Sequence, residues 1–556
     1  MNLRIRIGKT VPSRLPQTPF RESGLGRIAG IAMFSVIALL AGIRFYRLRY
    51  FGESVDEGDN LAIGWLLTQE LKIYDSVFSH HTPLAYISTH IVAILSPSDD
   101  FTHFRVIPWF FLVLTGLSFL ISPLRLPLLL KALSSTLFMF FVAILAPLWL
   151  GHMVLMDGLW GYLFVCFGNV FLLPAALGHL EPGQRSKYFL LGGGGLLVGW
   201  VSGSLITLYP FLIVLLLTPL ILRGNKIDCR TSLKHLTRGI VLTAVFYLFW
   251  LLSFGSVQGF FEQAIVFNLK AYSQFTEYSE GLTGAIFGPS IVKVLRNHLY
   301  WLFVSENYID RICECLLLLG LFTFGCFVYF HERRSVWCSA ALVACSFILL
   351  SALRLRSGAY HAAPYYLGAV SLFAWSIGLA LSTRRLMIAI PVIAVVSLLG
   401  FDAVHQVHRY VPFSWNESSH SNAIVPSEPT FHSGLKMAGL QPTFQYIIEN
   451  TSPPEKIAAF PTLPIIYLKT KRLPAHSGVY YYPWNAKWEE NKGSTTTCNE
   501  VKHAMPKFIW LDRWKVWDRY EFGEFAKCLN EFITTNYRYV DRAKFPHLLH
   551  RNASSG

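Results

Sequence analysis

Long apolar runs, separated by short hydrophilic breaks, recur along this chain of 556 residues and leave few folds open to it. A helix needs about 17–25 apolar residues to cross a bilayer. Runs of this length, or close to it, occur at 28–46, 106–121, 131–148, 157–178, 189–206, 209–222, 238–254, 312–330, 336–353, 364–382 and 386–402. Only 15% of the residues are charged, whereas soluble proteins have about a quarter. We therefore predict an α-helical polytopic membrane protein and exclude a soluble multidomain enzyme.

The formal net charge of +15 is scattered over the breaks between the runs. Lys and Arg collect in cytoplasmic loops of membrane proteins, so the most basic breaks identify that side. These breaks carry Arg125 and Lys131, Arg185 and Lys187, the group at 223–238, Arg333 and Arg334, and Arg384 and Arg385. The opposite, extracytoplasmic side then holds 47–105, 149–156, 255–311, 354–363 and the chain after 403. We expect a multi-pass protein of the cell inner (plasma) membrane that contacts membrane lipids and binds no nucleic acid.

Two segments decide the number of spans within the transmembrane domain, 28–402. Residues 1–27 are basic and precede a long apolar run without a cleavage site, which predicts a cytoplasmic segment and an uncleaved first span. Residues 82–96 are apolar but short and contain His90, so we favour a juxtamembrane or partial helix there. Counting this segment as a span would reverse the sidedness of the loops after it. The prediction is eleven spans, with ten to thirteen left open.

The composition changes after the last apolar run. Residues 403–435 are rich in Ser, Pro, His and Asn and are interpreted as a linker. Strand and helix patterns alternate in 436–556, with strands expected at 456–460 and 507–512 and a helical stretch near 519–534. This alternation predicts a small α/β domain on the extracytoplasmic side.

Three smaller features have structural interpretations. The run Gly192–Gly195 follows no strand, so we expect it to allow close helix packing rather than to bind a dinucleotide. The triplet Cys313-Glu314-Cys315 has metal-ligand residue types but lies in an apolar run, where packing is the expected role. Cys498 and Cys528 lie in the polar C-terminal part. They could pair if this part is extracytoplasmic, and the sequence leaves the pairing open.

Charged residues gather on the predicted extracytoplasmic side, and the first group contains Asp56 and Glu57. A carboxylate beside a polar cleft can accept a proton from an attacking hydroxyl or amine. The alternative is structural: Ser54 or Asp56 would cap a helix over 58–71, and Glu57 would favour its dipole. Composition alone favours this structural alternative.

A second group on the same side runs from His80 and His81 to Tyr86. Adjacent His side chains point to different faces of a regular element, so this pair alone is a poor metal site. The alternative is a set of interfacial polar residues before a helix that starts near Pro83. Asp157, at the outer end of another run, is either a second acidic site residue or a helix cap.

A third group has five polar members on one short loop and the run that follows it: Arg354, Arg356, Tyr360, His361 and Tyr365. Positive charge is normally excluded from this side of the membrane. Arg presents a planar fork of donors that matches phosphate oxygens, so this group is a candidate seat for a lipid phosphate. Snorkelling Arg residues with an aromatic belt are the alternative. The 255–300 loop could line the same cavity with Asn268, Lys270 and Tyr272.

The order of these motifs resembles a known family. Asp56-Glu57, His81-Thr-Pro-Leu-Ala-Tyr86, Asp157 and Arg354…Tyr360-His361…Pro364-Tyr365 are followed by a polar tail with Gln445-Tyr-Ile-Ile-Glu-Asn-Thr-Ser-Pro-Pro454 and Tyr467-Leu-Lys-Thr-Lys-Arg472. Together they look like the polytopic glycosyltransferases that use polyprenyl-phosphate sugars. These form the protein O-mannosyltransferase and lipid A aminoarabinose transferase superfamily, which has the GT-C fold. The resemblance covers residues 28–475.

The resemblance implies an inverting sugar transfer on the extracytoplasmic face, from a polyprenyl-phosphate donor to a lipid, glycan or protein acceptor. It makes Asp56 the general base and Glu57 its acidic partner. It also implies that the donor phosphate or sugar contacts Tyr86, Asp157, Arg354, Arg356, Tyr360, His361 and Tyr365. The family commonly has a Lys where this chain has His81, so a phosphate contact at His81 depends on its protonation.

Other functions remain open on sequence grounds. A transporter or flippase for a lipid-linked or anionic solute would place ionisable or helix-breaking residues near mid-span, whereas here they gather at outer ends. A non-catalytic envelope assembly protein with the same fold would tolerate the loss of Asp56. No nucleotide site is visible, no cofactor is certain, and a divalent metal is left open.

Overall fold

The structure is a computed structural model. It describes residues 24–49, 54–98, 100–180, 183–202, 228–275, 308–331, 359–382, 437–513 and 515–552, with isolated positions between them. Several predictions from sequence fall wholly or mostly outside the described residues: Arg354, Arg356, the runs at 209–222, 336–353 and 386–402, and the linker at 403–435.

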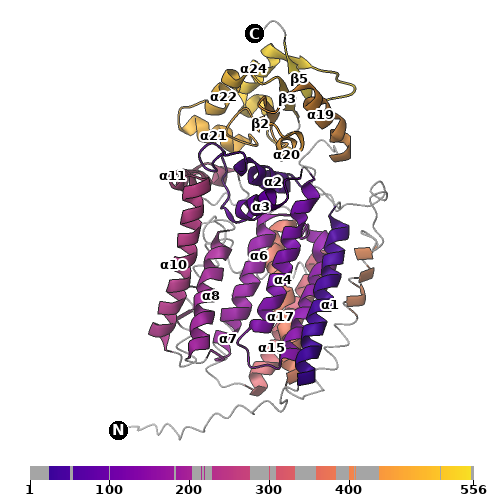
Figure 1. Ribbon diagram of the computed structural model, residues 1–556, viewed down its shortest axis with the longest axis vertical. Coiled ribbons are helices and arrows are strands. Elements are labelled where there is room, and N and C mark those ends of the chain that lie inside the picture. Colours follow the sequence, from indigo (N-terminus) through magenta and orange to yellow (C-terminus); the bar gives the residue numbers. More distant parts are fainter. Residues whose placement is uncertain are drawn as a thin grey trace.

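Long helices lie alongside one another and form a bundle (Figure 1). They are α1 (Gly24–Leu48), α4 (Val106–Ile121), α5 (Leu128–Leu145), α6 (Met156–Phe167), α8 (Gln184–Val201), α10 (Cys229–Phe254), α15 (Tyr308–His331) and α17 (Ala363–Ser382). A π-helical turn, Gly168–Leu172, joins α6 to the short α7 (Leu173–Ala176). We call the end of the bundle that adjoins the C-terminal domain the cap end.

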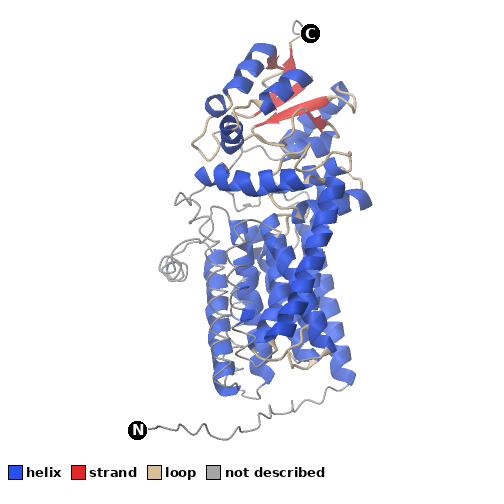
Figure 2. Cartoon of the chain, turned by 90° about the vertical axis from the view of Figure 1, so that its left-hand side faces the viewer, coloured by secondary structure: helices blue, strands red, loops and turns tan. Residues whose placement is uncertain are grey.

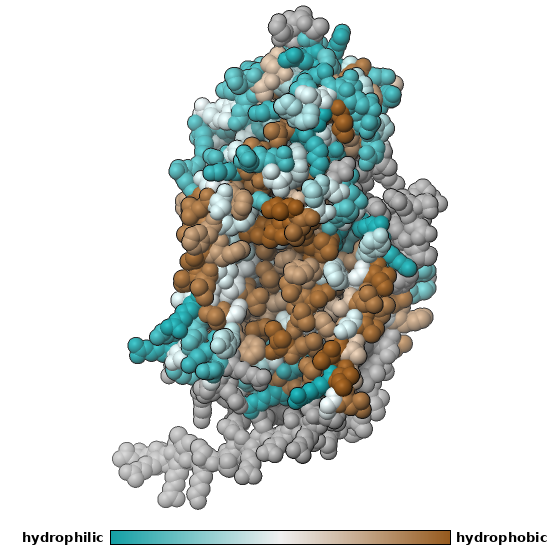
Figure 3. Space-filling view, in the orientation of Figure 1, coloured by the Kyte–Doolittle hydropathy of each residue, from teal (hydrophilic) through white to brown (hydrophobic). Residues whose placement is uncertain are grey.

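The bundle has the surface of a membrane protein. Outward side chains such as Leu39 on α1 and Phe249 on α10 are 64% and 66% exposed, and Figure 3 shows an apolar zone along the bundle below a more hydrophilic C-terminal part. Soluble proteins rarely expose apolar areas of this extent. Among the described residues, six stretches are long and apolar enough to cross a membrane: Gly24–Leu48, Thr102–Ile121, Leu128–Trp149, Met156–Ala176, Cys229–Phe254 and Tyr360–Ser382. The chain is a multi-pass membrane protein, and its full number of spans stays a prediction.

Glycines let α8 and α10 pack closely. A Cβ on Gly194 would overlap the backbone of Leu236 and Gly239, and a Cβ on Gly239 would overlap the carbonyl of Leu191. Small residues allow this approach, which favours helix association in a bilayer. The structure thus supports the packing interpretation for Gly193, Gly194 and Gly195, whereas a Cβ on Gly192 would meet nothing within 4 Å.

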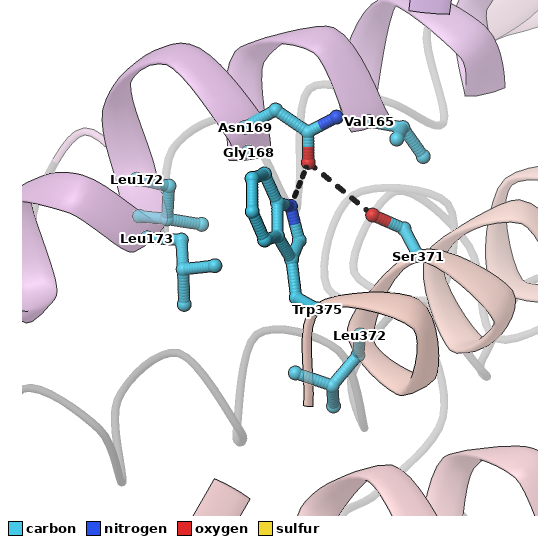
Figure 4. Close-up of a pocket in the computed structure, with 8 residues that line it drawn as sticks. All are labelled: Val165, Gly168, Asn169, Leu172, Leu173, Ser371, Leu372 and Trp375. Atoms are coloured by element: carbon cyan, nitrogen blue, oxygen red, sulfur yellow. Dashed lines mark hydrogen bonds between the residues drawn. The ribbon is translucent and has the colours of Figure 1, made fainter. Parts of the chain in front are cut away.

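A neutral polar network lies inside the bundle between α6 and α17 (Figure 4). Asn169 Oδ1 accepts hydrogen bonds from the Trp375 indole at 2.7 Å and the Ser371 hydroxyl at 3.3 Å. The Asn169 amide donates to Ser118 Oγ at 2.8 Å. A small pocket beside Asn169 is otherwise lined mainly by apolar side chains such as Leu172. Because its polar groups bond to one another, this network fixes helix packing and presents no charged group.

Two shorter helices lie between the bundle and the C-terminal domain (Figure 1). They are α2 (Val55–Leu67), where a helix over 58–71 was expected, and α3 (Leu84–Leu95), which matches the predicted short helix within 82–96. The two pack tightly, since a Cβ on Gly64 would lie 2.8 Å from the backbone carbon of Thr89. Beside them lie the helical segments Val257–Phe260, Phe261–Phe267 and Asn268–Lys270.

The C-terminal part is the small α/β unit that the alternating patterns predict (Figure 2). Its strands are β1 (Lys456–Phe460), β2 (Leu473–Pro474), β3 (Phe508–Leu511), β4 (Tyr537–Tyr539) and β5 (Leu548–Arg551), in the order β2-β1-β3-β5-β4. β1 is parallel to β2 and β3, and β5 is antiparallel to β3 and β4. The helices are α19 (Met437–Asn450), α20 (Ile465–Thr470), α21 (Pro483–Asn491), α22 (Thr496–Ala504), α23 (Phe522–Phe525) and α24 (Lys527–Asn536). A disulfide between Cys498 and Cys528 joins α22 to α24.

The C-terminal domain is seated directly on α2 and the loop before α3. A Cβ on Gly58 of α2 would touch Ile465 of α20 at 3.6 Å. The amide of Phe78 donates to the carbonyl of Ser477 at 2.7 Å. The Lys471 ammonium lies 5.3 Å from the centre of the Trp65 ring. These contacts hold the layer of α2 and α3 between the bundle and the domain.

Candidate functional site

Asp56 lies in the first turn of α2, just beyond the cap end of α1. Its side chain is exposed, and the hydroxyl of Tyr360 donates a hydrogen bond of 2.5 Å to Asp56 Oδ2. Ser54 occupies the N-cap position, but its side chain makes no capping hydrogen bond. The expected Ser54 cap is therefore absent, whereas Asp56 and Glu57 do lie in the first turn, where negative charge favours the helix dipole. Asp56 is an accessible carboxylate, and Tyr360 is bonded to one of its two oxygens.

Glu57, the next residue, faces the opposite way and is buried. Its carboxylate forms a two-point ion pair with Arg105, with Nε–Oε1 at 3.0 Å and Nη2–Oε2 at 2.5 Å. Glu57 Oε1 also accepts the backbone amide of Val154 at 2.9 Å, and Asn60 donates to the Val154 carbonyl at 2.8 Å. Both carboxylate oxygens are occupied, so Glu57 anchors α2 to the start of α4 and to the loop before α6.

Asp157 is brought to the same place by α6. Its Oδ2 lies 2.8 Å from Nδ1 of His361, and its Oδ1 accepts the indole N–H of Trp160 at 3.0 Å. The side chains of His361 and Asp157 keep 20% and 14% of their surface exposed. Because Tyr360 and His361 are adjacent, with ring centres 4.0 Å apart, one dipeptide contacts both Asp56 and Asp157. Four residues singled out from the sequence therefore converge at the cap end.

Tyr365 and Tyr366 point away from this group, toward α15. The Tyr365 hydroxyl donates to Glu314 Oε2 at 2.6 Å, and the Tyr366 hydroxyl donates to Asp310 Oδ1 at 2.7 Å. Tyr365 is 1% exposed and Glu314 is fully buried. Tyr365 therefore sits behind the site, not at its surface.

Tyr86 belongs to a buried group around Asp59, which lies in the same acidic cluster of the sequence as Asp56 and Glu57 but was not among the predicted site residues. The Tyr86 hydroxyl is 2.7 Å from Ser79 Oγ and donates to Asp59 Oδ2 at 3.3 Å. Burial raises the pKa of Asp59 well above its usual range, and the negative charge of Asp56 raises this pKa further. The hydrogen bond from Tyr86 acts in the opposite direction. Asp59 lies one helical turn after Asp56, and this spacing on one helix face is the signal that could have identified it.

The two adjacent histidines have different surroundings. His80 is buried, and its Nδ1 lies 2.6 Å from the hydroxyl of Tyr480 in the C-terminal domain. His81 is half-buried, and its backbone carbonyl accepts the hydroxyl of Tyr74 at 2.6 Å. His81 thus lies in the layer that contains Asp56.

Arg354 and Arg356 lie outside the described residues, six and four positions before Tyr360 in the sequence. Among the side chains that the structure does describe, no group of three or more His, Cys, Asp or Glu is placed to hold a metal ion. Asp56 and Asp157 are each bonded instead to Tyr360, His361 or Trp160. We therefore derive no step through a metal.

Comparison with solved structures identifies the fold. An oligosaccharyltransferase from Archaeoglobus fulgidus, in its complex with Zn and sulfate, matches with a TM-score of 0.50 and 12% identity over 86% of this chain and 67% of that one. Its apo form matches with a TM-score of 0.50 and 13% identity over 87% and 69% of the two chains. ArnT from Cupriavidus metallidurans bound to undecaprenyl phosphate matches with a TM-score of 0.40 and 13% identity, over 94% and 98%.

Sequence comparison gives no relative: no family model matches the chain, and no curated protein is significantly similar to it. The similarity to known proteins therefore lies in the fold. The chain has the GT-C fold of membrane glycosyltransferases, as the order of its motifs predicts.

Proposed function

We propose that this chain is an integral-membrane inverting glycosyltransferase. It moves a sugar from a polyprenyl-phosphate donor to an envelope lipid, glycan or protein acceptor on the extracytoplasmic face of the inner membrane. The observation that carries the proposal is the convergence of Asp56 and Asp157, through Tyr360 and His361, at the cap end of a GT-C bundle. An exposed carboxylate next to a second acid–histidine pair suits proton removal from an incoming nucleophile.

The proposed reaction involves Asp56 and the two substrates, the acceptor and the polyprenyl-phosphate sugar. Asp56 accepts the proton of the acceptor hydroxyl or amine as that atom bonds to C1 of the sugar. The bond between C1 and the phosphate oxygen breaks, and its electron pair leaves with the polyprenyl phosphate. Attack from the side opposite the leaving group inverts the anomeric centre.

The leaving phosphate gains negative charge in the transition state, and nearby cations stabilise it. Arg354 and Arg356 are proposed for this role, since they precede Tyr360 by only six and four residues. His361 and Asp157 are proposed to contact the donor beside them. Glu57, held by Arg105, positions α2 and hence Asp56.

Two observations support an extracytoplasmic site. Disulfides persist in oxidising compartments, and the Cys498–Cys528 bridge lies in the domain at the cap end. Basic residues gather at the other end of the bundle, where Lys187 lies near the start of α8 and Lys234 and Arg238 lie in the first turns of α10 (Figure 1). Basic residues mark the cytoplasmic side.

The test compares envelope glycans and lipids by mass spectrometry in cells that lack the gene and in cells complemented with variants. Asp56→Asn is expected to leave the glycan or lipid product absent, as in the deletion, because the amide cannot accept the proton. Asp75→Asn is a matched control: Asp75 is exposed on the loop after α2, and its loss changes the charge equally.

Full restoration of the product by Asp56→Asn, at wild-type protein levels, would rule out the transferase proposal. If the deletion instead left the glycans unchanged and stopped translocation of labelled polyprenyl phosphate, the chain would be a flippase.

A further inference from the structure

Asp59 is a buried acid that forms no ion pair within the part of the chain that the structure describes. It lies on α2, one helical turn after Asp56, and is 5% exposed. Its Oδ2 accepts the hydroxyl of Tyr86 at 3.3 Å, whereas its buried Oδ1 has no hydrogen-bond partner among the described residues. The proposed reaction gives Asp59 no role, so the burial of this acid needs an explanation of its own.

Glu57, on the same helix, shows the contrast. It is 3% exposed, but Arg105 pairs with both of its oxygens and the amide of Val154 donates to one of them. A carboxylate that is buried without a counter-charge is strongly unfavourable, and such a group takes up a proton instead. Burial, and then the negative charge of Asp56, raise the pKa of Asp59 well above its usual range, against the opposing hydrogen bond from Tyr86.

Tyrosines surround Asp59 from three parts of the chain: the loop before α3, α3 itself and the C-terminal domain. After burial, the charge of Asp59 is among the causes that raise the pKa of Tyr74, Tyr86, Tyr480 and Tyr482. A tyrosine hydroxyl can form hydrogen bonds, but it brings no positive charge. These neighbours therefore suit a neutral acid better than an ionised one.

A chain of hydrogen bonds leads from Asp59 to the loop that carries His81. The Tyr86 hydroxyl is 2.7 Å from Ser79 Oγ, and Ser79 Oγ accepts the backbone amide of His81 at 3.2 Å. The hydroxyl of Tyr74 donates to the backbone carbonyl of His81 at 2.6 Å. Both backbone polar groups of His81 are thus held in this layer, and the amide is held through the chain that starts at Asp59.

A protonated Asp59 fits this chain. A protonated carboxyl has one O–H donor, and the Tyr86 oxygen lies within reach of Oδ2. Tyr86 can accept that hydrogen bond and donate its own hydrogen to Ser79, because either atom of the Tyr86–Ser79 pair can be the donor. An ionised Asp59 would instead draw the Tyr86 hydrogen to itself. The direction of the chain therefore depends on the proton of Asp59.

We propose that Asp59 is a positioning residue that, as a neutral carboxylic acid, ties the helix carrying Asp56 to the loop carrying His81. What it positions rests on the proposed function, in which Asp56 is the base, whereas its charge state does not. Reacting groups must be held in a precise geometry, and a misplacement of about 1 Å can cost about a hundredfold in rate. Loosening this link is therefore expected to slow the transfer.

Infrared spectroscopy of the purified full-length chain in detergent tests the charge state. At pH 7 an ordinary Asp, with a pKa of about 3.9, is ionised and lacks the C=O stretching band of a protonated acid. Asp59→Asn is expected to remove one such band from the wild-type spectrum. Tyr86→Phe is expected to shift this band, because the hydrogen-bond partner of the acid is lost.

Asp75→Asn, at an exposed position, is the control for the spectra and is expected to leave the band in place. The inference is overturned if Asp59→Asn and wild type have the same protonated-acid bands. Should Asp59→Asn fail to fold, a band that Tyr86→Phe leaves unshifted would overturn it as well.

Product formation in complemented deletion cells tests the positioning, at equal amounts of folded protein. Asp59→Ala is expected to form about tenfold less product than wild type in a fixed time. Asp59→Asn is expected to recover most of this loss, because its amide has the shape of the neutral acid and keeps a donor for Tyr86. A residue that only stabilised the fold would lower the thermal midpoint without this difference. Wild-type product from Asp59→Ala, or an equal loss in both variants, would refute the positioning role.

Asp56→Asn separates the two proposals. It is expected to abolish the product and to leave the infrared band of Asp59 in place. If Asp56→Asn keeps product formation, the transferase proposal fails, while the band still shows whether Asp59 is neutral. If Asp56→Asn loses the product and Asp59→Ala forms as much as wild type, the positioning role fails alone.

Discussion

At the scale of single residues, the neighbours Asp56 and Glu57 have opposite surroundings. Asp56 is exposed and has the Tyr360 hydroxyl at one oxygen. Glu57 is buried against Arg105. Breaking a buried ion pair leaves an uncompensated charge, which is strongly destabilising. In this acidic dipeptide, Asp56 is therefore placed to act as a base, whereas Glu57 is placed to hold α2 in position.

The hydrogen bond from Tyr360 gives a sharp prediction. Tyr360→Phe removes one hydroxyl and is expected to lower turnover by about tenfold, as loss of a hydrogen bond of about 1–1.5 kcal/mol implies. Tyr366→Phe is the matched control, because the Tyr366 hydroxyl bonds Asp310 on α15 and not Asp56. The measurement is the initial rate of product formation for both variants at equal folded protein. Equal rates for Tyr360→Phe and Tyr366→Phe would show that the hydrogen bond from Tyr360 to Asp56 does not contribute to turnover.

Sequence reasoning selected Asp56, Asp157, Tyr360 and His361, and the structure brings them together. Chemical type and predicted sidedness made them candidates, and the resemblance to a known family assigned their roles. The partner of Glu57 was not predictable, because Arg105 lies 48 positions away and nothing local links the two.

At the scale of elements, close contacts between helices set the packing. α8 and α10 meet through glycines on both sides. α2 and α3 meet where Gly64 faces Thr89. The apolar runs predicted these helices well, since hydropathy over a span is a strong signal. Their pairing depends on small residues whose partners lie in another run, which composition does not reveal.

The α8–α10 contact can be tested with one methyl group. Gly239→Ala places a Cβ on the Leu191 carbonyl, so the helices must move apart, and we expect destabilisation by about 1–3 kcal/mol. Gly192→Ala is the control, since a Cβ there meets nothing within 4 Å. The measurement is the thermal midpoint of the purified proteins in one detergent. A midpoint for Gly239→Ala at or above that of the control would contradict the observed packing.

At the scale of the whole molecule, the layer of α2 and α3 is held between a membrane bundle and a soluble domain. The strand at 456–460 and the strand within 507–512 were predicted correctly, because short β-rich runs between turn residues are a local signal. The way in which the domain sits on α2 was not predictable from the sequence. Contacts such as that of Ile465 with Gly58 join parts of the chain about 400 residues apart.

The disulfide predicts how the domain responds to reduction. Replacing both Cys498 and Cys528 by Ser is expected to destabilise the C-terminal domain by about 2–4 kcal/mol and to leave the bundle intact. The measurement is limited proteolysis, with fragments assigned by mass spectrometry. Faster cleavage confined to the region after 436 is expected, and Cys166→Ser, a buried thiol of α6, serves as the control. Unchanged cleavage would show that the bridge adds nothing to the domain.

The adjacent residues Tyr360 and His361 link two helices of the site. One peptide unit fixes the spacing of the two donors, and the two acids that they contact come from α2 and α6. Any shift at the start of α17 therefore moves both donors at once. A displacement of this dipeptide is therefore expected to disturb the contacts of both carboxylates and not of one alone.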